Sequence, residues 1–112
     1  MIRELDVAIL RDTVARLIVE ANYNIPADIL DALRAAVARE ESPLGRRTLE
    51  QLVRNYEVAS AERVPVCQAS GVAVVCLEIG QDVHGVGGWL HGAVHAGIGG
   101  GTQGGYRRRP GA

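Results

Sequence analysis

The sequence predicts an α+β fold that is predominantly helical, with three N-terminal amphipathic helices followed by a buried strand and a glycine-rich, poorly ordered C-terminal tail. Apolar residues recur at helical spacing between residues 7 and 63, which predicts the helices. A short valine-rich run at residues 72–79 predicts the strand. The tail is indicated by the glycines, because 13 of the 14 lie from Gly71 onward.

The three helices are expected from their apolar stripes and from residues that favour helix starts. The second should begin near Pro26 and Asp28, because proline needs no N–H partner there and a carboxylate favours the positive helix end. The third should begin at Pro43, with Ser42 as its N-cap. The first covers residues 7–21 and has an apolar stripe formed by Val7, Leu10, Val14, Leu17, Ile18 and Ala21.

The second half of the chain differs in amino-acid composition from the first. Residues 72–79 are almost continuously apolar, as expected for a strand buried on both faces. Residues 97–105 contain six glycines, each of which opposes a helix by roughly 1 kcal/mol relative to alanine. We therefore expect residues 97–112 to form a poorly ordered Gly/Arg-rich tail. Because no cap or further strand follows it, residues 1–112 are interpreted as a truncated part of a larger domain.

Composition excludes several classes of function. The formal net charge is −1 and the pI about 6.3, so a nucleic-acid or anionic-membrane partner is not expected. All 12 basic residues are arginine, which excludes a P-loop lysine and a pyridoxal-phosphate Schiff base. The chain has neither a signal-like start nor an apolar run of transmembrane length, so a reducing, cytoplasmic setting is expected.

The two cysteines receive different interpretations from the residues around them. Cys67 lies in the stretch Val-Pro-Val-Cys-Gln-Ala-Ser-Gly between a predicted helix and the predicted strand. It is either a small buried hydrophobe or a thiolate serving metal or nucleophilic chemistry, and its position alone leaves both open. Cys76 lies inside the apolar run and is expected to be a buried hydrophobe.

Four separated stretches resemble, in order and with similar spacing, the class I, iron–sulfur-dependent fumarate hydratases and L(+)-tartrate dehydratases. They are Glu-Ala-Asn-Tyr-Asn-Ile-Pro at 20–26, Glu-Glu-Ser-Pro-Leu-Gly at 40–45, Val-Pro-Val-Cys-Gln at 64–68, and Glu-Ile-Gly-Gln-Asp-Val-His at 78–84 followed by Val-Gly-Gly at 86–88. The family's α part is considerably longer than 112 residues. The resemblance therefore identifies the chain as the N-terminal part of the α catalytic domain.

The resemblance also implies roles for particular residues. Cys67 matches the cysteine of a Cys-Gln-Asp-Thr-Gly motif, which is one of three thiolate ligands of a [4Fe-4S] cluster, and Gln68 matches a substrate-binding glutamine. Ala69 replaces the motif's acid–base aspartate, so no catalytic residue is assigned with certainty. Arg108, in Tyr-Arg-Arg, resembles an arginine that binds a substrate carboxylate, although a solvated basic tail explains it equally well.

The histidines and the glycine run give weaker signals. His84 is expected to make a structural hydrogen bond rather than to act in catalysis. His91 and His95 share helical spacing typical of zinc sites, but Gly92 stands where a zinc hydrolase has its glutamate. The glycine run at 99–104 formally matches a dinucleotide motif, but it does not directly follow a strand.

By resemblance, the function is that of a fragment of a hydro-lyase that reversibly dehydrates a 2-hydroxy dicarboxylic acid, from malate to fumarate or from L-tartrate to oxaloacetate. The implied partners are a β subunit or β domain, a small dicarboxylate substrate and a dimeric assembly. One alternative is an inactive truncated paralogue that acts only as a scaffold or subunit contact, and the isolated chain is expected to be inactive. A second alternative is a metal-binding module formed by Cys67, His84, His91 and His95.

Overall fold

The computed structural model describes residues 1–67 and 72–103, which fall into two compact units. Among the described residues, one unit combines residues 1–19 with residues 72–103, and the other consists of residues 20–67. Helix α1 (Val7–Tyr23) begins in the first unit and ends in the second. No helix in the described part of the chain is long and apolar enough to cross a membrane.

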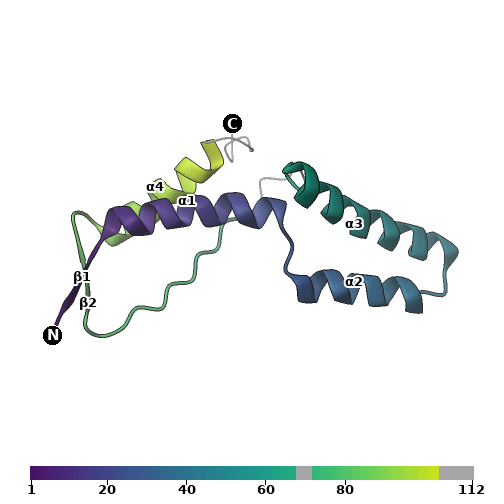
Figure 1. Ribbon diagram of the computed structural model, residues 1–112, viewed down its shortest axis with the longest axis horizontal. Helices are drawn as coiled ribbons and strands as arrows, with labels where there is room; N and C mark the ends of the chain where they lie inside the picture. Colours follow the sequence, from purple (N-terminus) through teal and green to yellow (C-terminus); the bar gives the residue numbers. More distant parts are fainter. Residues whose placement is uncertain (68–71, 104–112) are drawn as a thin grey trace. The chain divides into compact units, whose positions relative to one another are not determined.

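The three predicted N-terminal helices are confirmed. They are α1, α2 (Ala27–Arg39) and α3 (Pro43–Glu62) (Figure 1). Pro26 is the N-cap residue of α2, and Asp28 lies in its first turn. Ser42 caps α3 as predicted, because its hydroxyl oxygen accepts a hydrogen bond from the Gly45 N–H at 3.2 Å.

In the second unit, α2 and α3 form a hairpin joined by a three-residue turn (Figure 1). Arg34 on α2 pairs with Glu57 on α3 at 3.0 Å, but both side chains are about half exposed, so the pair adds little stability. No residue of α2 is buried, and Ala59 is the buried residue of α3. The hairpin therefore leaves much of its apolar surface in solvent.

The first unit contains two short parallel strands, β1 (Arg3–Asp6) and β2 (Val83–Val86). Helix α1 follows β1 directly, and the Asp6 carboxylate accepts a hydrogen bond from the Ala8 N–H at 2.9 Å. That contact satisfies one of the unpaired donors at the start of the helix. Val7 is buried beside Gly85 and Gly88, so the glycines after residue 80 let the chain approach the first turn of α1 closely.

The expectation of a poorly ordered tail is wrong for residues 97–103, which belong to helix α4 (Leu90–Gln103). Gly97 and Gly101 are buried against α1, where a Cβ on Gly97 would lie 2.5 Å from the Arg11 carbonyl oxygen. A Cβ on Gly101 would lie 2.8 Å from the Ala15 carbonyl oxygen. Close helix packing thus offsets the low helix propensity of glycine. Residues 104–112 lie outside the described residues.

The predicted buried strand at residues 72–79 is also wrong. This segment is extended but pairs with no described strand, and Val72 and Val74 are 89% and 82% exposed. The prediction rested on the valine-rich composition, because β-branched side chains favour strands. Burial needs a neighbouring sheet, which the described residues do not provide.

The α1–α4 contact predicts opposite effects for two neighbouring glycines. Gly97→Ala should lower the free energy of unfolding by about 1–3 kcal/mol, because the added methyl group overlaps the backbone of α1. Gly99→Ala has no atom within 4 Å of its Cβ and should be neutral or stabilising by up to about 1 kcal/mol. Urea unfolding followed by circular dichroism measures both. Equal stability of the two variants would contradict the packing of α4 on α1.

Candidate functional site

The segment that leads to Cys67 leaves α3 through an unusual turn at Arg63. This residue has left-handed backbone angles (φ 52°, ψ 52°), which cost a non-glycine residue on the order of 1 kcal/mol. Its guanidinium lies 4.9 Å from the centre of the Tyr23 ring and 3.5 Å from the Glu20 carboxylate. The cation–π contact and the ion pair thus help to hold the turn.

Two hydrogen bonds then hold the residue before Cys67. The Val66 N–H donates to the Asn22 carbonyl oxygen at 3.0 Å, and the Asn55 side-chain amide donates to the Val66 carbonyl oxygen at 2.8 Å. Both the donor and the acceptor of Val66 are therefore satisfied, one by the end of α1 and the other by α3. The backbone that carries the candidate cysteine is fixed from both sides.

A third contact ties α3 to the end of α1, because the Ser60 hydroxyl donates to the Asn24 side-chain oxygen at 2.7 Å. The stretch at 20–26 and residues 64–67 are thus neighbours in space, although about 40 residues separate them in the sequence. The structure brings these two parts of the sequence pattern together. The Asn-Tyr-Asn stretch supports the cysteine segment rather than forming an independent site.

The predicted site residues are only partly described. Cys67 is exposed, which contradicts the buried-hydrophobe interpretation of this cysteine. Cys76 is also exposed, so the prediction that it is a buried hydrophobe is wrong. The reason is that the run around Cys76 has no covering sheet among the described residues. Gln68, Ala69 and Arg108 lie outside the described residues.

The stretches at 40–45 and 78–84 differ in the hydrogen bonds that their side chains form. In the stretch at 40–45, the Glu40 carboxylate accepts a hydrogen bond from the Ser42 N–H at 3.0 Å, and its backbone oxygen accepts one from Arg46 at 2.9 Å. These bonds shape the turn into α3. His84 lies in β2 opposite Glu4, is exposed, and forms no side-chain hydrogen bond with a described residue, so the bond expected for it is not found.

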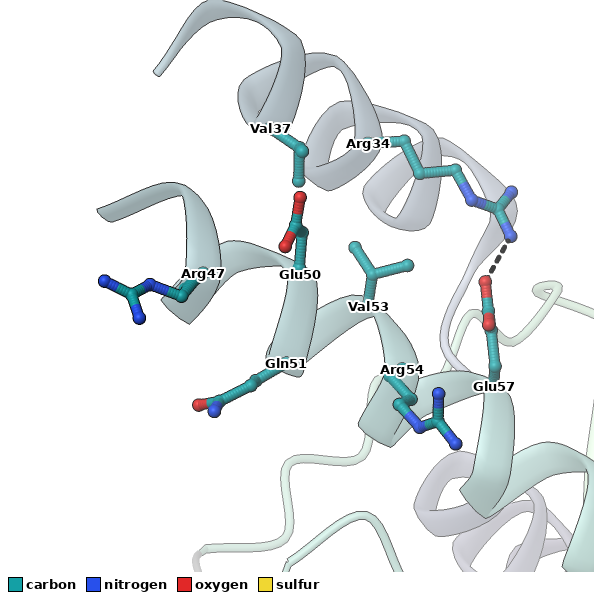
Figure 2. A pocket seen from close by; sticks show the side chains of 8 residues that line it. All are labelled: Arg34, Val37, Arg47, Glu50, Gln51, Val53, Arg54 and Glu57. Atoms are coloured by element: carbon teal, nitrogen blue, oxygen red, sulfur yellow. Dashed lines mark hydrogen bonds and ion pairs between the residues drawn. The ribbon is translucent and has the colours of Figure 1, made fainter. Parts of the chain in front are cut away.

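A groove of about 560 Å³ lies between α2 and α3 (Figure 2). Val37 and Val53 contribute apolar surface, and Arg34 reaches across from α2 to Glu57 on α3. The remaining lining is polar or charged and comes from α3: Arg47, Glu50, Gln51 and Arg54. Charges of both signs line this groove, and none of the predicted site residues does, so it offers no specific site for a dianion.

A second groove, of about 320 Å³, lies in the first unit between α4 and residues 73–77. His91 and His95 both line it, and the His91 ring stacks on Trp89 with centroids 5.5 Å apart. Within residues 1–67 and 72–103, however, no three His, Cys, Asp or Glu side chains are grouped to hold a metal ion. The zinc interpretation and the four-residue metal module therefore have no support in the described part of the chain.

Comparison with known proteins decides the family. The sequence model described as "Fumarate hydratase (Fumerase)" matches residues 11–110. The chain belongs to the fumarate hydratase family. A relative from Methanocaldococcus jannaschii, described as "Putative L(+)-tartrate dehydratase subunit alpha", is 36% identical over 73 residues, which are 65% of this chain and 26% of the relative. The chain thus spans about a quarter of that relative's length, and no solved structure matches it.

The cofactor that the fumarate hydratase family implies can be tested against this chain's own donors. Cys67 fits the part of one ligand, because the residue is exposed and the N–H and carbonyl oxygen of Val66 before it are both hydrogen-bonded. The chain contains only two cysteines, so it cannot provide three thiolates. A three-thiolate cluster would need sulfur ligands from outside these 112 residues.

Sequence reasoning missed Asn55 and Arg63, which position the cysteine segment of this fumarate hydratase family member. An asparagine in the interior of a predicted helix gave a weak signal, since its side chain often bonds to backbone. Arg63 gave none, because the left-handed position after a helix is usually occupied by glycine or asparagine. Both residues are recognisable only once α1 and α3 are placed together.

The two hydrogen bonds at Val66 lead to a prediction about Asn55. Asn55→Ala removes the hydrogen bond to the Val66 carbonyl oxygen, so the segment should open more often. The Val66 N–H, which is bonded to the Asn22 carbonyl oxygen, should then exchange faster by roughly 2- to 12-fold, the range expected for the loss of one hydrogen bond. Gln51→Ala, one turn earlier on α3 and with no hydrogen bond to a described residue, is the matched control. Amide exchange measured by NMR compares them. If both variants exchange at the wild-type rate, Asn55 does not hold the segment.

Proposed function

We propose that the chain is part of a hydro-lyase that reversibly dehydrates a 2-hydroxy dicarboxylic acid, either malate to fumarate or L-tartrate to oxaloacetate. The family match over residues 11–110 is the observation that carries this proposal. The similarity to a protein described as a tartrate dehydratase α subunit supports it. Val66, the residue before Cys67, is held by Asn22 from the stretch at 20–26 and by Asn55 on α3, which is consistent with a constrained role for the Cys67 sulfur.

In this proposal Cys67 is one of three thiolate ligands of a [4Fe-4S] cluster. When bound, the cluster supplies Lewis acidity toward the oxygens of the substrate. The chain's own contribution is to hold the Cys67 backbone through Val66, so that the thiolate does not have to be ordered when the cluster binds. The other two thiolates come from outside this chain.

Substrate binding is assigned to Gln68 and Arg108. A side-chain amide next to the cysteine can hydrogen-bond a carboxylate without adding charge. A guanidinium can bind a second carboxylate through two parallel hydrogen bonds, which suits a dicarboxylate. Both assignments rest on the sequence pattern.

The proposed partner is a β subunit or β domain of the same enzyme, since the relative is described as a subunit alpha. The large amount of exposed apolar surface on α3, including Leu44 at 70% and Leu52 at 43%, is compatible with contacts to further protein. Two exposed cysteines suit a reducing compartment, so we place the enzyme in the cytoplasm.

Ala69 favours a second candidate function, a non-catalytic scaffold or subunit contact. The resemblance places an acid–base aspartate at this position, and alanine has no titratable group. Loss of a proton-transfer group costs on the order of 10²- to 10⁴-fold in rate. The described helices and the hydrogen bonds at Val66 are formed by other residues, so a scaffold could persist without activity.

The two functions are separated by grafting Cys67-Gln68-Ala69-Ser70-Gly71 into a full-length enzyme of the family. Cluster absorbance should be retained, because the thiolate ligand is unchanged, while turnover of fumarate or tartrate should fall by on the order of 10²- to 10⁴-fold. Ala69→Asp in the graft should recover most of the activity. Ser70→Thr alone should not, since serine keeps the hydroxyl group. Full activity of the Ala69 graft would show that this position transfers no proton.

A further inference from the structure

Glu20, on the last turn of α1, has each of its two carboxylate oxygens engaged by a different partner. Its Oε2 atom accepts a hydrogen bond from the Asn24 side-chain amide at 2.6 Å. Its Oε1 atom lies 3.5 Å from the Arg63 guanidinium in the turn after α3. One side chain therefore joins two contacts that would otherwise be separate.

Both partners of Glu20 lead to the end of α3. The Asn24 side-chain oxygen accepts a hydrogen bond from the Ser60 hydroxyl at 2.7 Å, and Arg63 directly follows the last residue of α3. The carboxylate is thus connected to α3 by two routes. Loss of either partner leaves one route intact, whereas loss of Glu20 weakens both.

The backbone conformation of Arg63 makes this carboxylate important for Cys67. Among the described residues, Arg63 is the single non-glycine residue with a positive φ, at 52°, and its side-chain contacts have to offset the cost of that conformation. The turn allows the Val64 N–H to bond back to α3 at 3.1 Å and directs the chain toward Val66. If Glu20 no longer holds Arg63, the turn opens more often and the backbone before Cys67 loses its fixed position.

The two contacts of Glu20 differ in strength. The Glu20 and Arg63 side chains are 47% and 58% exposed, so their ion pair alone contributes little. The hydrogen bond from Asn24 is short and its acceptor is charged, which makes it the stronger contact. Because both contacts share one carboxylate, each restricts the position of that group for the other.

We propose that Glu20 is a positioning residue for Cys67, because its carboxylate fixes the turn at Arg63 and thereby the backbone from which the thiolate reaches the cluster. This inference rests on the proposed function, in which Cys67 is a cluster ligand. Glu20 acts through the backbone of residues 63–66, so its removal should loosen the ligand rather than delete it.

The test combines two rates. The first is hydrogen exchange of the Val66 amide in the 112-residue chain, and the second is anaerobic iron release to a ferrous chelator from a complete family enzyme that carries residues 11–110 of this chain. Glu20→Ala should raise both rates by roughly 3- to 30-fold, the range for losing one hydrogen bond and one exposed ion pair. Glu20→Gln keeps an oxygen acceptor for Asn24 but no charge for Arg63, so it should raise them by roughly 2- to 5-fold.

Glu57 provides a matched control. It is likewise about half exposed and pairs with an arginine of another helix, Arg34, at 3.0 Å. Glu57→Ala should leave both rates unchanged, because this pair joins α3 to α2 rather than to the end of α1. Equal rates in Glu20→Ala and Glu57→Ala would overturn the proposal, as would faster Val66 exchange with unchanged iron release.

Cys67→Ser separates this proposal from the proposed function. If Cys67→Ser loses the cluster while Glu20→Ala releases iron at the unmodified rate, only the role of Glu20 is wrong. If Cys67→Ser retains the cluster, the ligand role of Cys67 is wrong, and the role of Glu20 is wrong with it.

Discussion

The candidate site depends on how the backbone of Val66 is held. Its N–H is bonded to Asn22 at the end of α1 and its carbonyl oxygen to Asn55 on α3, so the next residue, Cys67, has a defined starting point. This arrangement needs the left-handed turn at Arg63, which is stabilised by Glu20 and Tyr23. The hydrogen bonds at Val66 and the contacts of Arg63 therefore hold the backbone before Cys67, although the helices around it have few buried side chains.

The described chain buries few apolar side chains. Its buried apolar side chains are Val7, Val14, Tyr23, Ala59 and Ala93. Fourteen large apolar residues of the described chain are exposed. In the first unit, glycines allow α4 to approach α1 at backbone distance, and packing there relies on close approach rather than on large side chains. A chain that covers its apolar surface this sparingly suits a protein that completes its packing with further protein.

The helices were predictable because their signals are local. Periodicity defined α1, and Ser42-Pro43 marked the start of α3 to the residue. The errors concern long-range packing: propensity predicted no helix at Gly97 and Gly101, since the compensating contacts come from α1. Likewise, the apolar run around Val74 indicates extended backbone but cannot tell whether a sheet covers it. Cys67 was found from the sequence pattern, whereas Asn55 became recognisable only from its contact with Val66.

We propose that Cys67 ligates an iron–sulfur cluster when residues 11–110 stand in a complete enzyme of the fumarate hydratase family. Iron content and cluster absorbance after anaerobic reconstitution test it most directly, in a complete family enzyme that carries residues 11–110 of this chain. Cys67→Ser should lose most of the cluster signal, because one of three thiolates is removed. Cys76→Ser, which changes the chain's other exposed cysteine, should reconstitute like the unmodified protein. A Cys67→Ser protein that binds the cluster as fully as the unmodified protein would show that Cys67 is not a ligand.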